Sequence, residues 1–592
     1  MSRRNRRAAD QAWNEDRGDS TAADRSSPQI AQPPAQKPAT PKPAEGFTPL
    51  DPFPAATGMF GADRLAQIAW AFVVLGIVIR AVRFLLNFPL WPDEAYLAHN
   101  FLDRGYLDLL RALDYAQVAP LLYLWVQKTV VMICGFSEYS LRLYAFLGSI
   151  ASLLLFRHLA GRLLQGIARL MAIGTFAVAY PLIRYAAEAK PYGSDMLVTL
   201  VLLVLLVEWR LGREKTRWLW ALAVAMPVAV LLSYPAMFVV PAISLAMAMD
   251  LVPSGTRRQW LAWLGISAAA AGGAALLFFA SARAQIDVAG PEMRTGWEQA
   301  FPPLDSAKHL ALFLLESHTG EAFSYPAGGA RGASSLTTLC WLTALVLLVR
   351  GRQFWLATLF TLPLALNFTA AALHAYPYAG HSRLMLYMAP IFCLLTGLGA
   401  AAILSVMKNR RWSAGAPVVV ALVVLTAIGC IASVRDFLKP YKETCWQRNR
   451  DFARWFWTDK ALDAELVCVS SDWKLPISSV PDGNELASVY FCNQRIYSRR
   501  HARCLPPQIE HVSKDHPLRC ARFRPKAATE RDEAKFQEWL RSMEGKYRLV
   551  AREKYPLTFF VHEHELKCID QVEMYEFVPA ERSVADRPQT LR

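Results

Sequence analysis

The chain has 592 residues, of which 54% are hydrophobic and 18 are tryptophan, a composition too apolar for one soluble domain. The apolar residues gather in runs of about 17–25, the length that crosses ~30 Å of hydrocarbon as a helix. We therefore predict a polytopic α-helical membrane protein. The formal charge of +15 does not indicate nucleic acid, because the basic residues lie in a tail, in short loops and in a C-terminal region, as topology signals do.

The first segment, residues 1–61, is rich in Pro, Ala, Ser and Arg and has few large apolar residues. Such a composition cannot bury a core, so we expect a disordered cytoplasmic tail. The first apolar run, Leu65–Phe88, begins too late and is too long for a signal peptide. It is therefore expected to be a retained first span.

Ten further runs have the length and hydropathy of spans, and the loops between them alternate in charge. Lys and Arg concentrate in residues 157–169, 210–217, 257–258, 350–352 and 408–411. The positive-inside rule places these loops in the cytoplasm. The predicted spans are Tyr139–Phe156, Ile167–Tyr185, Tyr192–Val207, Trp218–Leu232, Pro235–Leu251, Trp260–Phe279, Leu336–Val349, Phe354–Leu373, Leu384–Val406 and Ala416–Val434.

One apolar stretch, Val118–Cys134, does not fit this alternation. If it crossed the membrane, every later basic loop would lie outside. We therefore predict a juxtamembrane or re-entrant helix on the outer side, interrupted by Gln127 and Lys128. The result is a transmembrane domain of about eleven helices over residues 62–435, with the N-terminus inside and the C-terminus outside.

This topology brings ionisable residues together on the outer face. Asp93 and Glu94 follow the first span, and the second outer loop carries Glu188. Ionisable groups near a membrane are candidates for a functional site, whereas helix capping or snorkelling is the structural alternative. The candidate catalytic residues are Asp93, Glu94 and Glu188, and the candidate substrate-binding residues are Arg184, Lys190, Tyr192, His381 and Arg383.

These residue types suit a lipid-linked phosphate whose head lies at the outer surface. Arg and Lys can hold the phosphate and stabilise the charge that develops on it as a leaving group. A carboxylate such as Asp93 or Glu94 can take the proton of an attacking hydroxyl. The chain has no Walker loop and no strand-borne GxGxxG motif, which disfavours a nucleotide-sugar donor. No cofactor and no metal site are expected, although the chemistry leaves room for a divalent metal.

Several stretches resemble one family in order and spacing: PDEAYLAHN, APLLYLWVQK, GFSEYSLRLYAFLGSIASLLLF and RYAAEAKPYGSDML. They are similar to the C-type glycosyltransferases, membrane enzymes that use polyprenyl-phosphate sugars, and most of all to the protein O-mannosyltransferase and lipid A aminoarabinose transferase branch. The resemblance covers residues 65–211 well and the later spans by hydropathy only.

The resemblance implies that Asp93 is the catalytic aspartate, that Glu94 is a second acidic position, and that Glu188–Tyr192 is the second-loop motif. It also implies that the APLLYLWV stretch is a juxtamembrane helix. The chain departs from the aminoarabinose transferases at Gln117–Pro120, where that branch has a Glu-Lys-Pro-Pro run. The lysine of that run is missing, and Lys190 or Arg383 is expected to take its place.

The C-terminal region, residues 436–592, is charged and has short strand-like runs at residues 465–471, 487–492, 547–551 and 571–578, with a helix-like stretch at Glu530–Met543. We predict a small extracytoplasmic α/β domain. Its six cysteines are expected to form at least one disulfide, whose connectivity the sequence does not define; they are Cys445, Cys468, Cys492, Cys504, Cys520 and Cys568.

The predicted function is transfer of a sugar from a polyprenyl-phosphate donor to a lipid, glycan or protein acceptor of the cell envelope. The expected location is the bacterial cytoplasmic membrane, with membrane lipids as partners and no nucleic acid. Two alternatives stay open: a non-catalytic envelope-assembly protein and a transporter. A transporter would show paired halves with helices broken at mid-membrane. The meeting of Asp93, Glu188 and Arg383 in one site would favour an enzyme over both.

Overall fold

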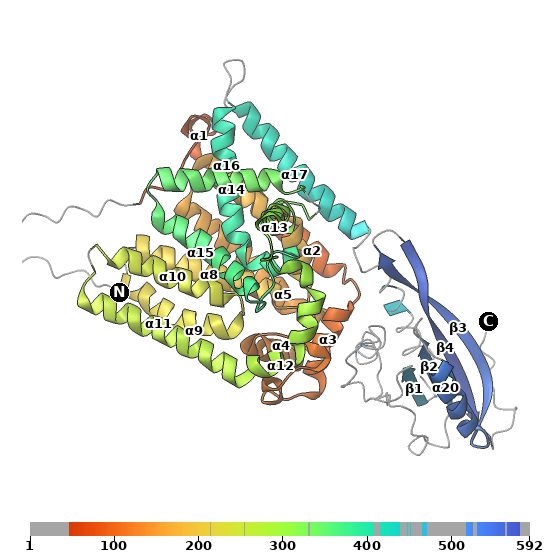
Figure 1. The fold of residues 1–592 in the computed structure, drawn as a ribbon. Coiled ribbons are helices and arrows are strands. Elements are labelled where there is room, and N and C mark those ends of the chain that lie inside the picture. The colour runs from red at the N-terminus through yellow and green to blue at the C-terminus, as the bar shows by residue number, and fades with distance from the viewer. Residues whose placement is uncertain are drawn as a thin grey trace, which may run out of the picture. The chain divides into compact units, whose positions relative to one another are not determined.

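The fold is described from a computed structural model (Figure 1). It describes residues 47–212, 215–253, 255–329, 332–407, 415–438, 447, 450–451, 465–470, 496, 517–524, 530–562 and 565–580. The N-terminal 46 residues and part of the C-terminal region therefore lie outside the description. Three of the cysteines predicted to form disulfides, Cys445, Cys492 and Cys504, are among the residues left out.

The helices of the membrane region agree with the hydropathy pattern, since each of the predicted spans falls on a helix or on a helix pair. Their bounds are Pro54–Phe60 (α1), Ala62–Leu85 (α2), Pro92–Asp103 (α3), Leu121–Cys134 (α4), Glu138–Leu163 (α5), Gly166–Val178 (α6), Tyr180–Arg184 (α7), Tyr192–Leu211 (α8), Lys215–Leu232 (α9), Ala236–Leu251 (α10), Arg257–Leu277 (α11), Arg283–Gly296 (α12), Ala307–Thr319 (α13), Ser335–Arg350 (α14), Phe354–Ala372 (α15), Ala389–Val406 (α16) and Gly415–Leu438 (α17). Short turns of helix at Tyr185–Ala187 (η3), Phe278–Ala282 (η4), Glu298–Ala300 (η5), Glu321–Phe323 (η6) and Ser382–Met388 (η7) connect them.

The chain is a multi-pass membrane protein. Within the described residues, seven helices are long and apolar enough to cross a membrane, or eight if the bent pair α6–α7 counts as one span. The predicted juxtamembrane segment forms α4, which has 14 residues. At 1.5 Å per residue this helix rises about 21 Å, less than the ~30 Å of the hydrocarbon core.

Helix α16 is the centre of the bundle and packs against α6 and α14. In the span Ser382–Val406, which contains α16, 78% of the most apolar stretch is buried inside the protein. The backbones approach closely here, because a Cβ on Gly399 of α16 would lie 1.8 Å from the carbonyl oxygen of Cys340 in α14. Small residues at such contacts allow membrane helices to pack by van der Waals contact.

The chain bends by 47° between α6 and α7, and the second outer loop follows this bend. Pro181 lacks the N–H that would bond the carbonyl of Ala177, so the regular hydrogen-bond pattern of α6 cannot continue. Arg80 of α2, which is fully buried, satisfies the freed groups: its guanidinium donates to the carbonyls of Ala177 (2.8 Å) and Phe176 (3.2 Å). The bend therefore positions residues 184–190, which carry several predicted site residues.

The structure differs from the predicted disordered tail in residues 47–61, which are ordered. The backbone of Leu50 bonds Leu163 and Gln165 at the turn between α5 and α6. Phe53 is 2% exposed, and Gly166, with a φ of +53°, leaves the space that Thr57 occupies. A few apolar side chains in an otherwise polar tail are enough to dock it, and the composition average over 61 residues concealed them.

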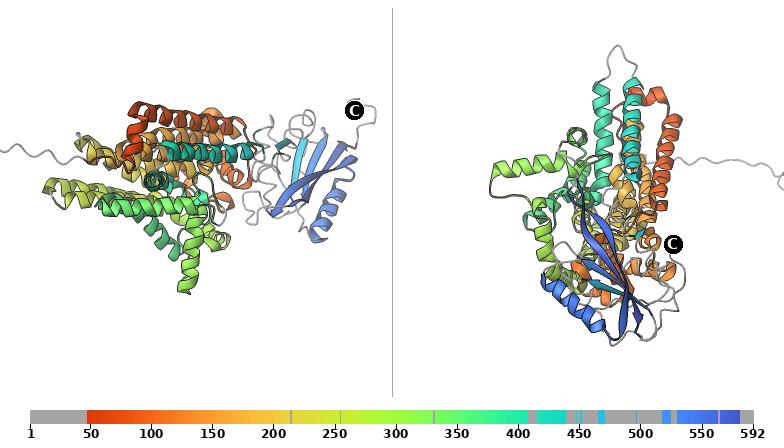
Figure 2. Two further views of the ribbon diagram at one scale, coloured as in Figure 1. Left: turned by 90° about the horizontal axis from the view of Figure 1, so that it is seen from above. Right: turned by 90° about the vertical axis from the view of Figure 1, so that its right-hand side faces the viewer.

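The C-terminal region forms a small α/β unit, as predicted. Its strands are Glu465–Ser470 (β1), Leu518–Arg524 (β2), Tyr547–His562 (β3) and Glu565–Pro579 (β4), in the sheet order β1-β2-β4-β3. The β1–β2 pair is parallel and the others are antiparallel. Helix α20 (Glu530–Met543) lies on one face of the sheet (Figure 2), where Phe536 and Trp539 contact Tyr575 and Phe577. The sequence did not predict β2, and the run at residues 487–492 lies outside the described residues.

Candidate active site

Asp93 lies in the first turn of α3, immediately after the first span and its connecting turn. Trp91 is the N-cap and Pro92 is the first helical residue, a position where proline's missing N–H costs nothing. One carboxylate oxygen of Asp93, Oδ2, accepts a hydrogen bond from Arg383 Nη1 at 3.1 Å. The Asp93 side chain is 30% exposed, and no described residue hydrogen-bonds its other oxygen. Asp93 is thus held on one side and accessible on the other.

Arg383 of η7 lies among three aromatic rings. Its guanidinium carbon is 5.3 Å from the ring centre of Trp91, 5.9 Å from that of Tyr192 and 5.1 Å from that of Trp297. The faces of such rings attract a cation. The Nε atom is buried and has no hydrogen-bond partner among the described residues. Arg383 therefore binds Asp93 and keeps further donors for a ligand.

The turn that presents Arg383 is itself fixed by two side chains. His381 is the N-cap of η7, and its Nδ1 accepts from the backbone N–H of Arg383 at 3.3 Å. Glu321 of η6 accepts from the N–H of Ser382 at 2.9 Å. The His381 ring also meets the Tyr185 ring edge-on at 6.3 Å. Of these contacts the sequence predicted His381 as a site residue and missed Glu321.

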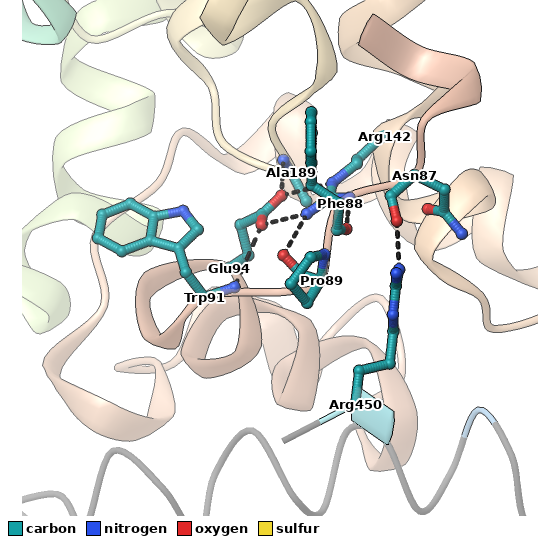
Figure 3. A network of polar contacts seen from close by, with 8 residues as sticks. All are labelled: Asn87, Phe88, Pro89, Trp91, Glu94, Arg142, Ala189 and Arg450. Carbon is teal, nitrogen blue, oxygen red and sulfur yellow. Dashed lines mark hydrogen bonds and ion pairs between the residues drawn. The ribbon is translucent and has the colours of Figure 1, made fainter. Parts of the chain in front are cut away.

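Glu94 has a different environment from its neighbour Asp93. It is 1% exposed, and Arg142 of α5 donates to both of its oxygens at 2.8 and 2.5 Å (Figure 3). The backbone N–H of Ala189 adds a bond of 2.8 Å to Oε1, and that of Trp91 adds one of 3.4 Å to Oε2. Both oxygens of Glu94 are thus occupied by donors from the protein, so Glu94 fits a positioning role better than a catalytic one.

The Glu94–Arg142 pair connects three parts of the site, as Figure 3 shows. Arg142 also donates to the carbonyls of Phe88 and Pro89 in the turn before α3. The bond to Ala189 holds the second outer loop between Glu188 and Lys190. At the same turn, Arg450 donates to the carbonyl of Asn87. The arginine at position 142, inside a predicted span, was the signal that could have revealed this pair.

Glu188 is buried, and one of its oxygens is unbonded within the described part of the chain. It is 5% exposed, and its Oε1 has no hydrogen-bond partner among the described residues. Burial, and next the negative charge of Glu94, raise the pKa of Glu188 from its ordinary 4.5 to about 7, although Arg184 and Arg383 oppose the change. A carboxyl with a pKa near neutrality can both take up and release a proton under working conditions.

Lys190 is a buried ammonium with a neutral partner. Its side chain is 7% exposed, and its Nζ donates to Gln117 Oε1 at 2.5 Å. Burial lowers the pKa of Lys190, and the charge of Asp93 opposes this effect. Gln117 was noted in the sequence as the departure from the Glu-Lys-Pro-Pro pattern, but its contact with Lys190 was not predicted.

Arg184 contacts a buried cluster at the end of α17. It lies 3.5 Å from Asp436 of α17 and from the hydroxyl of Tyr180. Asp436 also binds Arg83 of α2 at 2.6 Å. This buried cluster ties α7 to α2 and α17, and the role of Arg184 as a phosphate contact stays a prediction.

The predicted site residues thus separate into two groups. Asp93, Tyr192, His381 and Arg383 meet through direct contacts, and the charges of Glu188 and Lys190 act on the Asp93–Arg383 pair. Glu94 binds Arg142 and Arg184 binds Asp436, although the charge of Arg184 also acts on Glu188. Asp195 of α8, an ionisable residue of the second outer loop in the sequence, is not among the predicted site residues. It is buried with an oxygen that no described residue bonds. Among the described residues, no three His, Cys, Asp or Glu side chains form a group that could hold a metal ion.

Comparison with known proteins gives likenesses of fold. No protein-family model and no curated protein sequence matches the chain. The structure of ArnT from Cupriavidus metallidurans bound to undecaprenyl phosphate is 11% identical, covers 85% of this chain and 97% of that one, and superposes with a TM-score of 0.46. The oligosaccharyltransferase AglB from Archaeoglobus fulgidus, in complex with an inhibitory peptide and a dolichol-phosphate, is 11% identical, covers 85% and 75%, and has a TM-score of 0.40. Both matches are likenesses of fold to solved structures.

Proposed function

We propose that this chain transfers a sugar from a polyprenyl-phosphate donor to a hydroxyl of an envelope lipid, glycan or protein. The reaction would take place at the outer face of the bacterial cytoplasmic membrane, with the N-terminus in the cytoplasm and the C-terminal unit outside. The observation that carries the proposal is the Asp93–Arg383 ion pair of 3.1 Å. In it, a carboxylate with one accessible oxygen adjoins a cation that has unused donors.

Asp93 is the proposed general base. The acceptor hydroxyl would donate its hydrogen to Asp93 Oδ1, the oxygen that Arg383 does not bind. As that proton moves to Asp93, the acceptor oxygen bonds the anomeric carbon from the side opposite the phosphate. The bond from this carbon to the phosphate oxygen breaks, and its electron pair leaves with the polyprenyl phosphate. The product is therefore inverted, with no covalent intermediate on the protein.

Arg383 and Lys190 are the proposed contacts for the phosphate. Arg383 can bind Asp93 through Nη1 and a phosphate oxygen through Nε or Nη2, because a guanidinium carries five donors in one plane. Lys190 adds a point charge whose only hydrogen-bond partner among the described residues is a neutral amide oxygen. Two cations at a leaving phosphate stabilise the charge that develops there. The phosphate then needs no proton to depart.

Glu188 is proposed to bind the acceptor or sugar hydroxyls, with its pKa near 7 making it the second candidate base. Tyr192, Trp91 and Trp297 surround Arg383 and offer aromatic surface to a sugar ring. Convergence of Asp93, Arg383 and the charges of Glu188 and Lys190 supports an enzyme over the two alternatives, an assembly protein and a transporter. Neither alternative requires a base beside a cationic clamp.

The Asp93→Asn variant tests the proposal because it keeps the shape of the side chain and removes the base. We expect turnover, measured as release of polyprenyl phosphate in vesicles supplied with polyprenyl-phosphate sugars, to fall by about 10²–10⁴-fold while donor binding persists. Asp305→Asn is the matched control, since Asp305 is 65% exposed at the start of α13. Near-normal turnover in a correctly folded Asp93→Asn protein would contradict the assignment. Mass spectrometry of envelope glycans and glycolipids with and without the protein would identify sugar and acceptor.

A further inference from the structure

The segment Asp114–Pro120 has a strained backbone. Tyr115 and Ala116, in the turn η2 (Asp114–Ala116), have φ angles of 59° and 49°. Two consecutive side-chain-bearing residues in the left-handed region are unfavourable and persist only where surrounding contacts impose them. One such contact is the Tyr115 ring, which stacks on Tyr96 of α3 with 5.0 Å between ring centres. The strained turn therefore packs against α3, the helix that carries Asp93.

A single side chain from α12 fixes the other end of this segment. Gln285 is 1% exposed, and its amide pairs with both backbone groups of Ala119: Oε1 accepts at 3.0 Å and Nε2 donates at 3.1 Å. Tyr234 and Ser281 complete its hydrogen bonds at 3.0 Å each. Ser281 belongs to the π-helical turn η4, and such turns inside helices are frequent at functional sites.

Between these two anchors the amide of Gln117 can have only one orientation. Its Nε2 donates to the carbonyl of Tyr115 at 3.0 Å, so its oxygen must be the atom that faces Lys190 Nζ at 2.5 Å. Both the Tyr115 carbonyl and the Lys190 ammonium require this orientation of the amide. A carbonyl cannot accept a hydrogen bond from the amide oxygen, and an ammonium cannot donate one to the amide NH2 group. The strained segment thus presents one acceptor to one buried cation.

We infer that Gln117 is a positioning residue that holds the Lys190 ammonium in place for the donor phosphate. The site then needs one cation at this pair of positions, and either position 117 or position 190 can carry it. The inference rests on the proposed function for its ligand. Gln117 adds no charge to neutralise the ammonium, whereas a carboxylate there would compete with the phosphate. Gln117 therefore holds the cation in place and leaves its charge for an anion.

The ionisable groups around Lys190 come from several elements. Asp93 and Glu94 of α3 and Glu188 of the same loop favour the charged amine, and Arg383 of η7 disfavours it. None of these groups is altered by a change at position 117. A change in the titration of the Lys190 amine after substitution of Gln117 would therefore report on the Gln117 contact itself.

An exchange of the two side chains is the decisive test. Lys190→Gln should raise the KM for the polyprenyl-phosphate sugar by about tenfold or more, since a charge-assisted contact is lost. The double variant Gln117→Lys, Lys190→Gln returns one ammonium and one amide to the same pair of positions. We expect it to recover most of the donor KM. A folded double variant that is no better than Lys190→Gln would overturn the idea of a shared cation position.

A second measurement does not depend on turnover. Reductive methylation with formaldehyde at a series of pH values, followed by mass spectrometry, gives the titration midpoint of each lysine. Gln117→Leu should lower the midpoint of Lys190 by about one pH unit and Gln117→Glu should raise it. Lys128, whose Nζ donates to the carbonyl of Phe101 at 2.7 Å, is the internal reference and should not change.

The two measurements separate the two hypotheses. An unchanged Lys190 midpoint in Gln117→Leu would refute the positioning role, whatever the activity. If wild-type protein uses no polyprenyl-phosphate sugar, while the midpoint moves as expected, the positioning role stands and the proposed function fails.

Discussion

The buried carboxyl of Glu188 makes a quantitative prediction about stability. Because its pKa rises from 4.5 to about 7 on burial, the folded state holds this proton more tightly than the unfolded state does. The stability that this proton provides is fully present below pH 4.5 and is lost as the pH rises through 7. Each unit of pKa corresponds to about 1.4 kcal/mol, so the difference between 4.5 and about 7 corresponds to about 3 kcal/mol of unfolding free energy.

Glu188→Gln replaces the carboxyl with a neutral group of the same shape and so removes the titration. We expect wild type and variant to have similar unfolding free energies near pH 4.5. The variant should then become progressively more stable than wild type, by up to about 3 kcal/mol above pH 7. Thermal or denaturant unfolding in one detergent over this pH range measures the difference, with the exposed Glu298→Gln as control. A difference that stays constant from pH 4.5 to 8 would refute the reasoning.

Three further predictions follow from the geometry. Glu94→Gln or Arg142→Met alone should cost about 3–5 kcal/mol in unfolding experiments, because each leaves a buried partner uncompensated, and the double variant should cost less than the sum; additive costs would argue against the pair. Arg383→Ala should raise the donor KM more than Arg383→Lys does, because lysine keeps the charge but loses the planar fork; equal effects would mean that charge alone matters. Reporters fused after Val434 and at Phe136 should be extracytoplasmic and one within 210–217 cytoplasmic; a cytoplasmic reporter at Phe136 would mean that α4 crosses the membrane.

Neighbouring residues show how far a sequence can assign roles. Asp93 and Glu94 were expected to share the chemistry because they are adjacent and acidic. Successive residues of a helix point about 100° apart, so Asp93 meets Arg383 of η7 while Glu94 meets Arg142 of α5. Which of the two carboxylates keeps an accessible oxygen depends on partners that the local pattern does not contain.

Arg184 shows the same limit over a longer distance. Its charge and its place at the outer end of a span suggested a phosphate contact. In the fold it faces Asp436, which lies 252 residues further along the chain. The contact between Lys190 and Gln117, 73 residues apart, arose in the same way. Both depend on how helices pack, and hydropathy carries no information about which faces meet.

The sequence by itself determined the membrane class, the positions of the apolar helices, the short α4, the helix α20 and the presence of Asp93 in the first turn after the first span. These features depend on composition, period and charge within a few turns of chain, and such local terms act wherever the segment lies. The tertiary structure alone decided that Arg383 is the partner of Asp93, that Arg142 neutralises Glu94 and that residues 47–61 are packed. These outcomes depend on burial, since a charge removed from water must be paired or must change its protonation, and the available partner is set by the packed bundle.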